Sequence, residues 1–360
     1  MLRSTLFNRR PDLNFASDNA SVCDPAIMDA IMDANNNAAM PYGNDALTKK
    51  IEAKLSDVFE TKARVFLVAT GTAANALALS TMTPSWGTIY CHWESHVYED
   101  ECGAPEFFAN GAKLLPIKGP TSKIDPADLD DHARRGHGDV HMTKPEAVTI
   151  TQATEMGTLY NLNEIKNIHD ICQKHGLKLH MDGARFANAI AALKSTPAEM
   201  TWKSGVNALS FGATKNGALG VEAVILFDQT KAEEFEYRRK RGGHLFSKMR
   251  FLSAQMLAYL DNDLWLKNAS HANAMATRLS QGLMGIKGVE LNQPAAANMI
   301  FPKMPKPMIK GLLDQGFEFY ERWGDGEIRL VTAFNTTEQS VDALIKATSD
   351  LSARTDKSVD

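Results

Sequence analysis

The sequence has few cysteines, no long apolar run and no marked excess of charge of one sign. The cysteines lack C-x-x-C spacing, which argues against a disulfide framework or a zinc site and favours a reducing, cytoplasmic compartment; they are Cys23, Cys91, Cys102 and Cys172. No stretch reaches about 18 apolar residues, and no basic and then apolar signal follows Met1. We therefore expect a protein that neither spans nor crosses a membrane.

Charge is nearly balanced. Lysine and arginine together number 39 and aspartate and glutamate 43, which gives a net charge of −4. This balance offers no basic surface for a nucleic-acid backbone or an anionic membrane. Hydrophobic residues make up 44% and charged residues 23% of the chain, both close to globular averages, so disordered and fibrous classes are excluded.

The order of the predicted elements indicates an α/β fold. No internal repeat is present, and segments of helical period alternate with short apolar runs. This alternation favours a mostly parallel sheet covered by helices on both faces. The expected strands are Arg64–Val68, Thr88–Cys91, Ala147–Thr151, Leu177–Met181, Ala208–Phe211 and Ala223–Phe227.

The C-terminal part has a different pattern. A long helical stretch from about residue 247 to 284 precedes a mixture of helices and strands, an α+β arrangement. The chain has 360 residues, and at about 150 residues per domain it should form two domains. We expect an N-terminal arm over 1–20, a large domain over 21–261 and a smaller domain over 262–360. The strands expected in the smaller domain are Val289–Leu291, Ala297–Phe301, Phe317–Trp323 and Ile328–Val331.

Small residues follow the first predicted strand. In open α/β sheets, ligands bind beyond the carboxyl ends of the strands, and Thr70–Asn75 stands at such a place and opens a helix. Small side chains let a phosphate approach the free N–H groups of a helix start, where the helix dipole favours an anion. The alternative is a simple helix cap.

An acidic residue ends a later strand. Asp182 is followed at once by Gly183 and Ala184, and Arg185 comes third. A carboxylate there can hold a protonated ring nitrogen, and Arg185 can grip a carboxylate with two hydrogen bonds. A structural ion pair between Asp182 and Arg185 is an equally good explanation of these two residues alone.

Lys215 stands among glycine, alanine and threonine residues in Ser210–Gly220. The small neighbours leave room for a bulky partner, and a neutral lysine amine is the nucleophile of Schiff-base chemistry. A solvated loop lysine is the alternative, although a surface loop has little use for so many glycines.

A histidine-rich segment, His92–His96, follows another strand. A flat imidazole at a strand end can stack on an aromatic cofactor, and the alternative is a polar group at a helix start. Together the four motifs match what pyridoxal 5′-phosphate requires, namely a phosphate nest, an acid for its ring nitrogen, a lysine and a flat neighbour. The glycine fingerprint G-x-G-x-x-G is missing, which argues against a nicotinamide-binding protein.

At these residues the chain resembles the low-specificity L-threonine aldolases, which include phenylserine aldolases. They belong to the β-eliminating-lyase branch of the aspartate-aminotransferase-like, fold type I pyridoxal phosphate enzymes. The likeness runs from about Phe15 to Leu351. It is strongest in Ala73–Asn75, Asp100–Phe108, Thr149–Glu155, His180–Asn188, Thr214–Gly217 and Lys248–Ser253.

The resemblance implies that Lys215 carries the cofactor as a Schiff base and that Asp182 pairs with the pyridinium nitrogen. It places His96 on the face of the cofactor ring. The residues that it implies around the cofactor phosphate are Gly71, Thr72 and Arg250, with Arg185 also near the cofactor.

The resemblance also implies a substrate site. Ser17, Arg185 and Arg329 match positions that bind the α-carboxylate, and His141 matches a histidine near the β-hydroxyl. The segment Tyr42–Asp45 matches a loop that in this family lies close to a neighbouring subunit's site. The implied assembly is a homotetramer, a dimer of dimers.

The activity implied is aldol cleavage of L-threonine, L-allo-threonine and other β-hydroxy-α-amino acids, such as phenylserine, to glycine and an aldehyde. Catalysis would rest on Lys215, Asp182, His96 and His141. The alternatives are another reaction on the same scaffold (β-elimination, transamination or serine hydroxymethyl transfer) and a protein that senses an amino acid without turnover.

Two departures from the family pattern concern the substrate. Ala333 and Asn335 stand where many relatives have histidine and aspartate, and Thr151–Glu155 replaces a Glu-Asn-Thr-His segment. We expect these changes to alter side-chain preference and stereoselectivity at Cβ and to leave cofactor binding intact.

Overall fold

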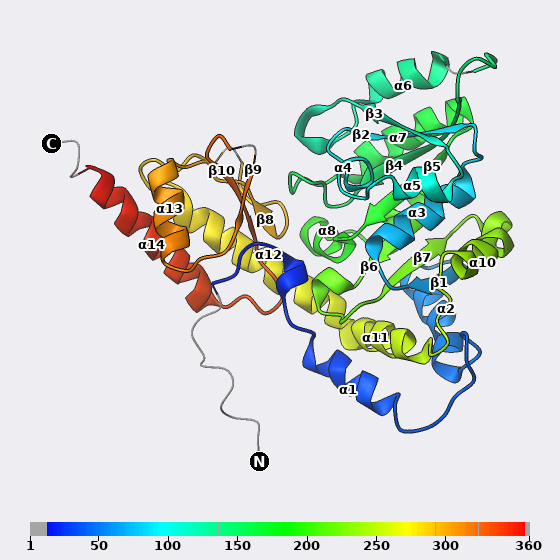
Figure 1. Ribbon diagram of the computed structural model, residues 1–360, viewed down its shortest axis with the longest axis horizontal. Helices are drawn as coiled ribbons and strands as arrows, with labels where there is room; N and C mark the ends of the chain where they lie inside the picture. The colour runs from blue at the N-terminus through cyan, green and yellow to red at the C-terminus, as the bar shows by residue number, and fades with distance from the viewer. Residues whose placement is uncertain (1–12, 136, 292, 323, 357–360) are drawn as a thin grey trace. The chain divides into compact units, whose positions relative to one another are not determined.

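The computed structural model describes residues 13–135, 137–291, 293–322 and 324–356 (Figure 1). The described chain divides into two compact units. One unit is Val22–Lys267, and the other combines the residues up to Ser21 with those from Asn268 onward. The N-terminal arm and the C-terminal segment are thus parts of one unit.

The larger unit contains a seven-stranded sheet in the order β1-β7-β6-β5-β4-β2-β3. Only β7 runs antiparallel to its neighbours among these strands, so the expectation of a mostly parallel sheet is confirmed. The strands are β1 (Arg64–Val68), β2 (Gly87–His92), β3 (Lys113–Ile117), β4 (Lys144–Thr151), β5 (Lys178–Gly183), β6 (Ala208–Gly212) and β7 (Glu222–Leu226).

Strand β3 was not expected from the sequence. Its five residues include Pro116, which lacks a backbone N–H and is typical of edge strands. The sheet order places β3 at an edge, where only one neighbour requires hydrogen bonds.

Helices cover both faces of this sheet. Ala208 packs with residues of α3 (Gly71–Met82) in one apolar cluster, whereas the Phe211 ring contacts Phe186 of α8 (Phe186–Leu193). Ala208 and Phe211 point to opposite faces because side chains alternate along a strand. The remaining helices that begin in this unit are α1 (Pro25–Asp33), α2 (Ala46–Val58), α4 (His96–Glu99), α5 (Ala104–Phe108), α6 (Pro126–Arg135), α7 (Leu162–His175), α9 (Pro197–Met200), α10 (Ala232–Arg241), α11 (Arg250–Leu260) and α12 (Leu264–Leu283).

The single helical stretch expected near residues 247–284 is interrupted. Helices α11 and α12 are separated by Asp261–Asp263, where Asn262 and Asp263 adopt positive φ angles of 49° and 56°. Asparagine and aspartate tolerate this left-handed conformation better than other side chains do. Apolar periodicity continues across the turn, which is why the sequence pattern alone did not reveal the break.

The second unit has a three-stranded antiparallel sheet in the order β8-β10-β9, formed by β8 (Met299–Ile300), β9 (Tyr320–Arg322) and β10 (Glu327–Val331). Helices α13 (Lys306–Asp314) and α14 (Glu338–Asp356) belong to the same unit. The strand expected over Val289–Leu291 is reduced to one bridge between Glu290 and Lys303. Trp323, the last residue of another expected strand, lies outside the described residues.

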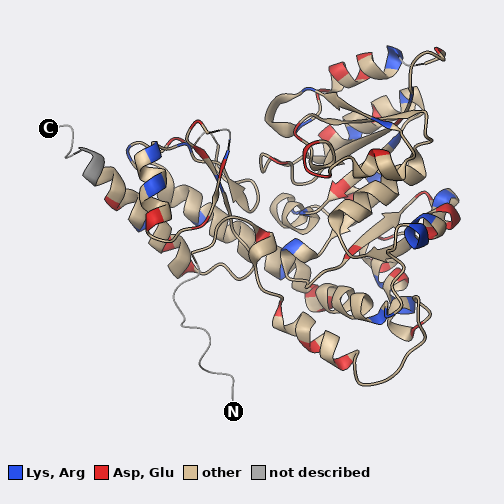
Figure 2. Cartoon of the chain, viewed as in Figure 1, with Lys and Arg blue, Asp and Glu red and all other residues tan. Residues whose placement is uncertain are grey.

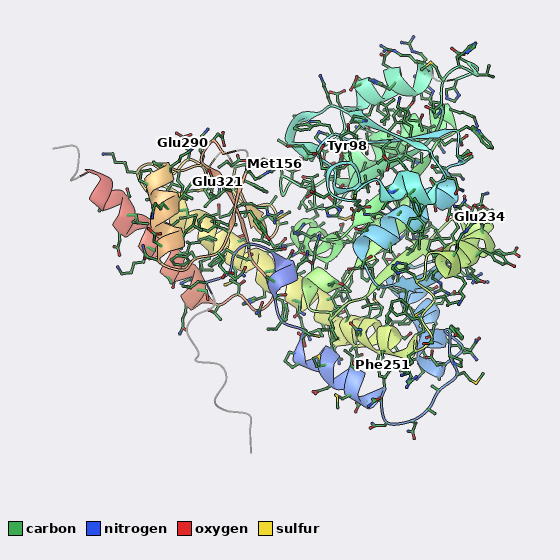
Figure 3. The ribbon with its side chains drawn as sticks, viewed as in Figure 1. Tyr98, Met156, Glu234, Phe251, Glu290 and Glu321 are labelled. Carbon is green, nitrogen blue, oxygen red and sulfur yellow. The ribbon has the colours of Figure 1, made fainter. Side chains whose placement is uncertain are left out.

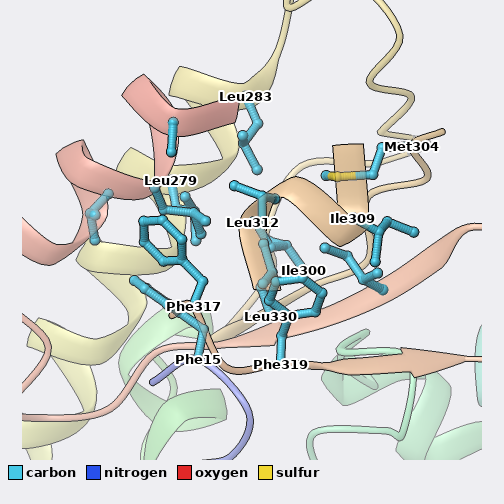
Figure 4. Packing of buried hydrophobic residues seen from close by; sticks show 14 of the residues in the cluster. Phe15, Leu279, Leu283, Ile300, Met304, Ile309, Leu312, Phe317, Phe319 and Leu330 are labelled. Atoms are coloured by element: carbon cyan, nitrogen blue, oxygen red, sulfur yellow. The ribbon is translucent and has the colours of Figure 1, made fainter. Parts of the chain in front are cut away.

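The core of this unit includes a residue of the N-terminal arm. Phe15 is 1% exposed and packs with Leu330 and other apolar side chains (Figure 4). Its backbone N–H donates to Glu318 O at 2.7 Å, and Val331 N–H donates to Phe15 O at 2.8 Å. The backbone of the arm is therefore bonded on one side to Glu318 and on the other to the last residue of β10.

Charged side chains of both signs are interspersed over the elements, with a mixed group on α10 (Figure 2). Within the described residues, none of the helices combines the length and the apolar composition needed to cross a membrane.

Candidate active site

One edge of the large sheet gathers the motifs that follow the strands. The parallel strands end at this edge, and β7 begins there, because Val68 and Gly212 both pair with Glu222. Asp182 pairs with Ser210 on the next strand, so Asp182 lies close to the loop that follows β6. The residues after β1, β2, β5 and β6 can therefore act on one ligand.

Helix α3 begins at this edge with an open N-terminus. The Thr70 Oγ1 atom accepts the N–H of Ala73 at 3.2 Å, which caps the helix. The N–H groups of Gly71 and Thr72 lie in the first turn, where backbone N–H groups have no acceptor within the helix. A Cβ added to Gly71 would have no other heavy atom within 4 Å, so there is room beside this turn for an anion.

Asp182 is a buried carboxylate whose two oxygens are both engaged. The side chain is 3% exposed. Oδ1 accepts the N–H of Ala184 at 3.0 Å, and Oδ2 accepts Nδ2 of Asn75 at 2.8 Å. Each oxygen retains a lone pair, so the carboxylate can accept a further bond from a protonated ring nitrogen.

His96 begins α4, the short helix that also carries Tyr98 (Figure 3). Its Nδ1 atom lies 2.9 Å from Oε1 of Glu101. This hydrogen bond raises the pKa of His96, while burial acts in the opposite direction. Asp182 and Lys215 also lie close enough for their charges to act on the imidazole.

Lys215 lies in the 3-10 turn η4 (Thr214–Asn216) and is half-buried. The turn is anchored by its last residue, because Asn216 Nδ2 donates to the Tyr259 hydroxyl and to Trp265 O, each at 2.8 Å. The lysine is therefore presented from a fixed backbone and not from a solvated loop.

Glu222 supports the same loop from β7. Its Oε2 atom accepts the N–H of Ala213 at 2.7 Å. Burial raises the pKa of Glu222 to about 7, although hydrogen bonds from Thr214 and Ala213 and the charge of Lys215 act in the opposite direction.

Comparison with known proteins identifies the family of this chain. The beta-eliminating lyase family matches residues 14–305. A low specificity L-threonine aldolase from Pseudomonas sp. (strain NCIMB 10558) is 45% identical over 91% of this chain and 94% of that protein. One from Pseudomonas aeruginosa is 43% identical over 92% of this chain and 96% of that protein. The chain belongs to the beta-eliminating lyases, among the low-specificity L-threonine aldolases.

Solved structures of this family and its neighbours confirm the aspartate-aminotransferase-like fold. A threonine aldolase from Leishmania major superposes with a TM-score of 0.88 at 29% identity, covering 94% of this chain and 99% of that chain. A serine palmitoyltransferase from Sphingomonas wittichii, at 18% identity, superposes with a TM-score of 0.70 over 95% of this chain and 87% of that chain.

The two arginines expected near the cofactor are placed differently in this beta-eliminating lyase. Arg185 lies three residues beyond Asp182 at the start of α8 and is 6% exposed. Arg250 begins α11, is half-buried, and donates from Nε to Ala34 O at 3.1 Å.

Ser17 and Arg329 belong to the second unit. Nη2 of Arg329, on β10, donates to Ala16 O at 3.1 Å, and Ser17 follows directly. Ser17 lines a small hollow that Ala333 and Asn335 also line. The two residues that depart from the family pattern are thus neighbours of a residue expected to bind substrate.

His141 lies apart from the other residues within one chain. It occupies an exposed turn, where its N–H donates to Oδ1 of Asp139 at 2.9 Å. The turn precedes the amino end of β4, whereas Asp182 pairs with Thr151 at the carboxyl end of that strand. His141 and Asp182 therefore lie at opposite ends of β4.

Three residues with contacts at this site were not given a role from the sequence. Asn75 and Glu101 stand in segments that resemble the family, but their contacts are not visible in the sequence. Asn75 bonds to Asp182, which is 107 residues away, and Glu101 bonds to His96 across a turn of the chain. Glu222 offered one signal, an acid at the start of a strand whose other residues are Ala, Val, Ile and Leu.

Proposed function

We propose that this protein cleaves L-threonine, L-allo-threonine and related β-hydroxy-α-amino acids such as phenylserine to glycine and an aldehyde, with pyridoxal 5′-phosphate as cofactor. The observation that carries the proposal is the gathering of Lys215, Asp182, His96 and the open start of α3 at one sheet edge. The chain that forms it is 45% identical to a low specificity L-threonine aldolase.

The residues present fit pyridoxal 5′-phosphate. Gly71 and Thr72 would hold its phosphate, Asp182 its ring nitrogen and Lys215 its aldehyde carbon, with Arg185 and Arg250 as further cationic groups near it. When bound, the cofactor accepts the electron pair released when the Cα–Cβ bond of the substrate breaks.

The protein's own residues then orient and deprotonate the substrate. As the resemblance implies, Arg185, Arg329 and Ser17 would bind the α-carboxylate, and the orientation of the bound carboxylate would decide which bond at Cα is aligned for cleavage. Asp182 keeps a negative charge beside the ring nitrogen, which stabilises its proton.

The β-hydroxyl must lose a proton as the aldehyde leaves. His96 and His141 are the candidates because imidazole titrates near neutral pH. His96 is favoured within one chain, since it lies at the same sheet edge as Asp182 and Lys215.

The assembly and compartment are further parts of the proposal. A homotetramer of two dimers would bring Tyr42–Asp45 to a neighbouring subunit's site, and the cysteine pattern favours the cytoplasm. The large domain over 21–261 would hold the cofactor, and the smaller domain over 262–360 would supply Arg329.

One experiment tests the activity. The purified protein is incubated with threonine, allo-threonine and phenylserine without folate, and glycine and aldehyde are quantified. Equimolar glycine and aldehyde support aldol cleavage, and Lys215→Ala is the control. A keto acid or ammonia as product would indicate transamination or β-elimination, and binding without turnover would indicate a sensor.

A further inference from the structure

One oxygen of Glu101 joins two residues of the site. Its Oε1 atom lies 2.9 Å from Nδ1 of His96 and accepts Nδ2 of Asn75 at 2.9 Å. The side chain of Glu101 is 3% exposed, so the carboxylate depends on these partners in place of water. Burial raises the pKa of Glu101, and the bonds from His96 and Asn75 oppose that shift.

Asn75 extends this connection to Asp182. Its amide nitrogen carries two hydrogens, and it donates to Glu101 at 2.9 Å and to Asp182 Oδ2 at 2.8 Å. Both hydrogens are used, which fixes the side chain between two buried carboxylates. The imidazole and the acid expected at the ring nitrogen are therefore held by one hydrogen-bonded series, His96–Glu101–Asn75–Asp182.

The backbone places Glu101 where it can do this. Cys102 and Gly103, which follow it, adopt positive φ angles of 51° and 72°, and Ala104 N–H donates to Glu101 O at 2.9 Å. This tight turn after α4 brings the carboxylate back beside His96.

We propose that Glu101 is a positioning residue that holds a hydrogen on Nδ1 of His96 and so leaves Nε2 as the atom that accepts the β-hydroxyl proton. A carboxylate oxygen only accepts, so the shared hydrogen belongs to Nδ1. Neutral His96 then has its free lone pair on Nε2. The proton passes from the β-hydroxyl to Nε2 as the Cα–Cβ bond breaks and the aldehyde leaves, and Nε2 then gives it up to Cα of the glycine product. Glu101 stays ionised and stabilises the imidazolium in between.

This inference rests on the proposed function, because it assumes that His96 faces the substrate. The effect of Glu101 on the protonation of His96 can be measured independently of turnover. Among the described residues, the charges that act on His96 are those of Glu101, Asp182, Glu155 and Lys215. Removal of the Glu101 charge should therefore lower the pKa of His96.

The first measurement is the pH dependence of carbethoxylation of His96, followed by peptide mass spectrometry. Diethyl pyrocarbonate modifies the neutral imidazole, so the midpoint reports the pKa of His96, whose side chain is 32% exposed. The full-length protein is measured with pyridoxal 5′-phosphate and after its removal. In Glu101→Gln we expect a lower midpoint and a severalfold faster modification at pH 6.

Glu106→Gln is the matched control, since it makes the same change five residues further on, in α5. It should leave the His96 midpoint where it is in the wild type. An unchanged midpoint in Glu101→Gln would overturn the inference. If Glu101→Gln does not accumulate as folded protein, Glu101→Asp decides in the same way, because the shorter side chain withdraws the carboxylate from Nδ1.

The second measurement separates positioning from a purely structural role. With phenylserine, Glu101→Gln should lower kcat by about tenfold or more, a part of the roughly 10²–10⁴ that base assistance supplies, with little change in KM. The acidic limb of kcat/KM should move in the same direction as the carbethoxylation midpoint. A higher KM with an unmoved pH profile would contradict the inference.

The two proposals can fail separately. If the wild-type protein releases neither glycine nor aldehyde, the proposed function fails whatever the midpoint of His96. If it releases both and the midpoint is the same in Glu101→Gln, only the role of Glu101 is wrong.

Discussion

Glu222 on β7 accepts the backbone N–H of Ala213 at 2.7 Å, two residues before Lys215. The strand that runs against its neighbours thus holds the loop of the expected cofactor lysine. The bond does not require a charge on Glu222, because a protonated acid or an amide oxygen also accepts an N–H.

This contact predicts a pH-dependent stability difference. Burial raises the pKa of Glu222 from its usual 4.5 to about 7, so the native state binds a proton that the unfolded chain has lost. The stability that Glu222 contributes is full below pH 4.5 and is lost as the pH rises through about 7. Glu222→Gln should match the wild type near pH 4.5 and exceed it at pH 8 by at most about 3 kcal/mol.

Urea unfolding at the two pH values measures this difference. Glu233→Gln, on the exposed side of α10, is the control and should show no such dependence. Equal unfolding free energies of Glu222→Gln and the wild type at pH 8 would show that the buried acid is not destabilising.

Lys215 should carry the cofactor. Borohydride reduction and peptide mapping should place the pyridoxyl group on Lys215, because the lysine is presented by an anchored turn at the sheet edge. A label on another lysine would refute the assignment. Lys215→Ala should lose aldol cleavage almost entirely and should keep its circular dichroism spectrum, since the lysine is not part of an apolar core.

Asp182→Asn should reduce turnover more than cofactor retention. The amide occupies the same space but has one acceptor oxygen, so it keeps only one of the two bonds from Ala184 and Asn75. It also does not stabilise a protonated ring nitrogen. The measurements are kcat and the dissociation constant of pyridoxal 5′-phosphate. Near-normal kcat would mean that Asp182 serves only the local hydrogen bonds.

Arg329→Ala should raise KM for every amino-acid substrate and leave cofactor binding unchanged. A charge-assisted bond to a carboxylate contributes about 1.5–3 kcal/mol, or roughly ten- to a hundredfold in KM. Arg322→Ala, a change on the adjacent strand β9, is the matched control. An unchanged KM in Arg329→Ala would indicate that Ala333 and Asn335 accompany a rebuilt carboxylate site.

His141→Phe tests the second candidate base. If His141 removes the β-hydroxyl proton, kcat should fall by about 10²–10⁴; if it only orients the hydroxyl, the loss should be smaller and should differ between threo and erythro substrates. Wild-type rates and diastereomer ratios would exclude His141 and leave His96 or a water as the base. The exposed turn that holds His141 leads us to expect no loss of stability.

The sequence predicted the central sheet because its signals are local. The runs at Arg64–Val68 and Ala208–Phe211 became β1 and β6 to within one residue. The ends of α7 are likewise set by residues close in sequence, since Asn161 and Glu164 form a capping box at its start and Gly176 caps its end. Strand β3 was missed because its apolar run contains Pro116, which argues against a strand. The turn at Asn262 was missed because the apolar period of the helices continues on both sides of it.

The contacts of the site depend on tertiary structure. Asn75 and Asp182 are 107 residues apart and meet through a single hydrogen bond. No spacing rule connects them, because α3 and β5 become neighbours only when the sheet has formed. The sequence was enough to single out Asp182 and Lys215 as candidate site residues. The residues that hold them in place could be named only from the fold.

The arm residue Phe15 has a consequence for synthesis on the ribosome. Its backbone partners are Glu318 and Val331, so Phe15 leaves the ribosome some 300 residues before the residues that bond to it. Domains fold as units while the chain emerges, N-terminal first, and the unit over Val22–Lys267 can complete its sheet during this interval. The arm cannot pack until the C-terminal residues of its core have been synthesised. The first described segment of the chain is therefore among the last to fold.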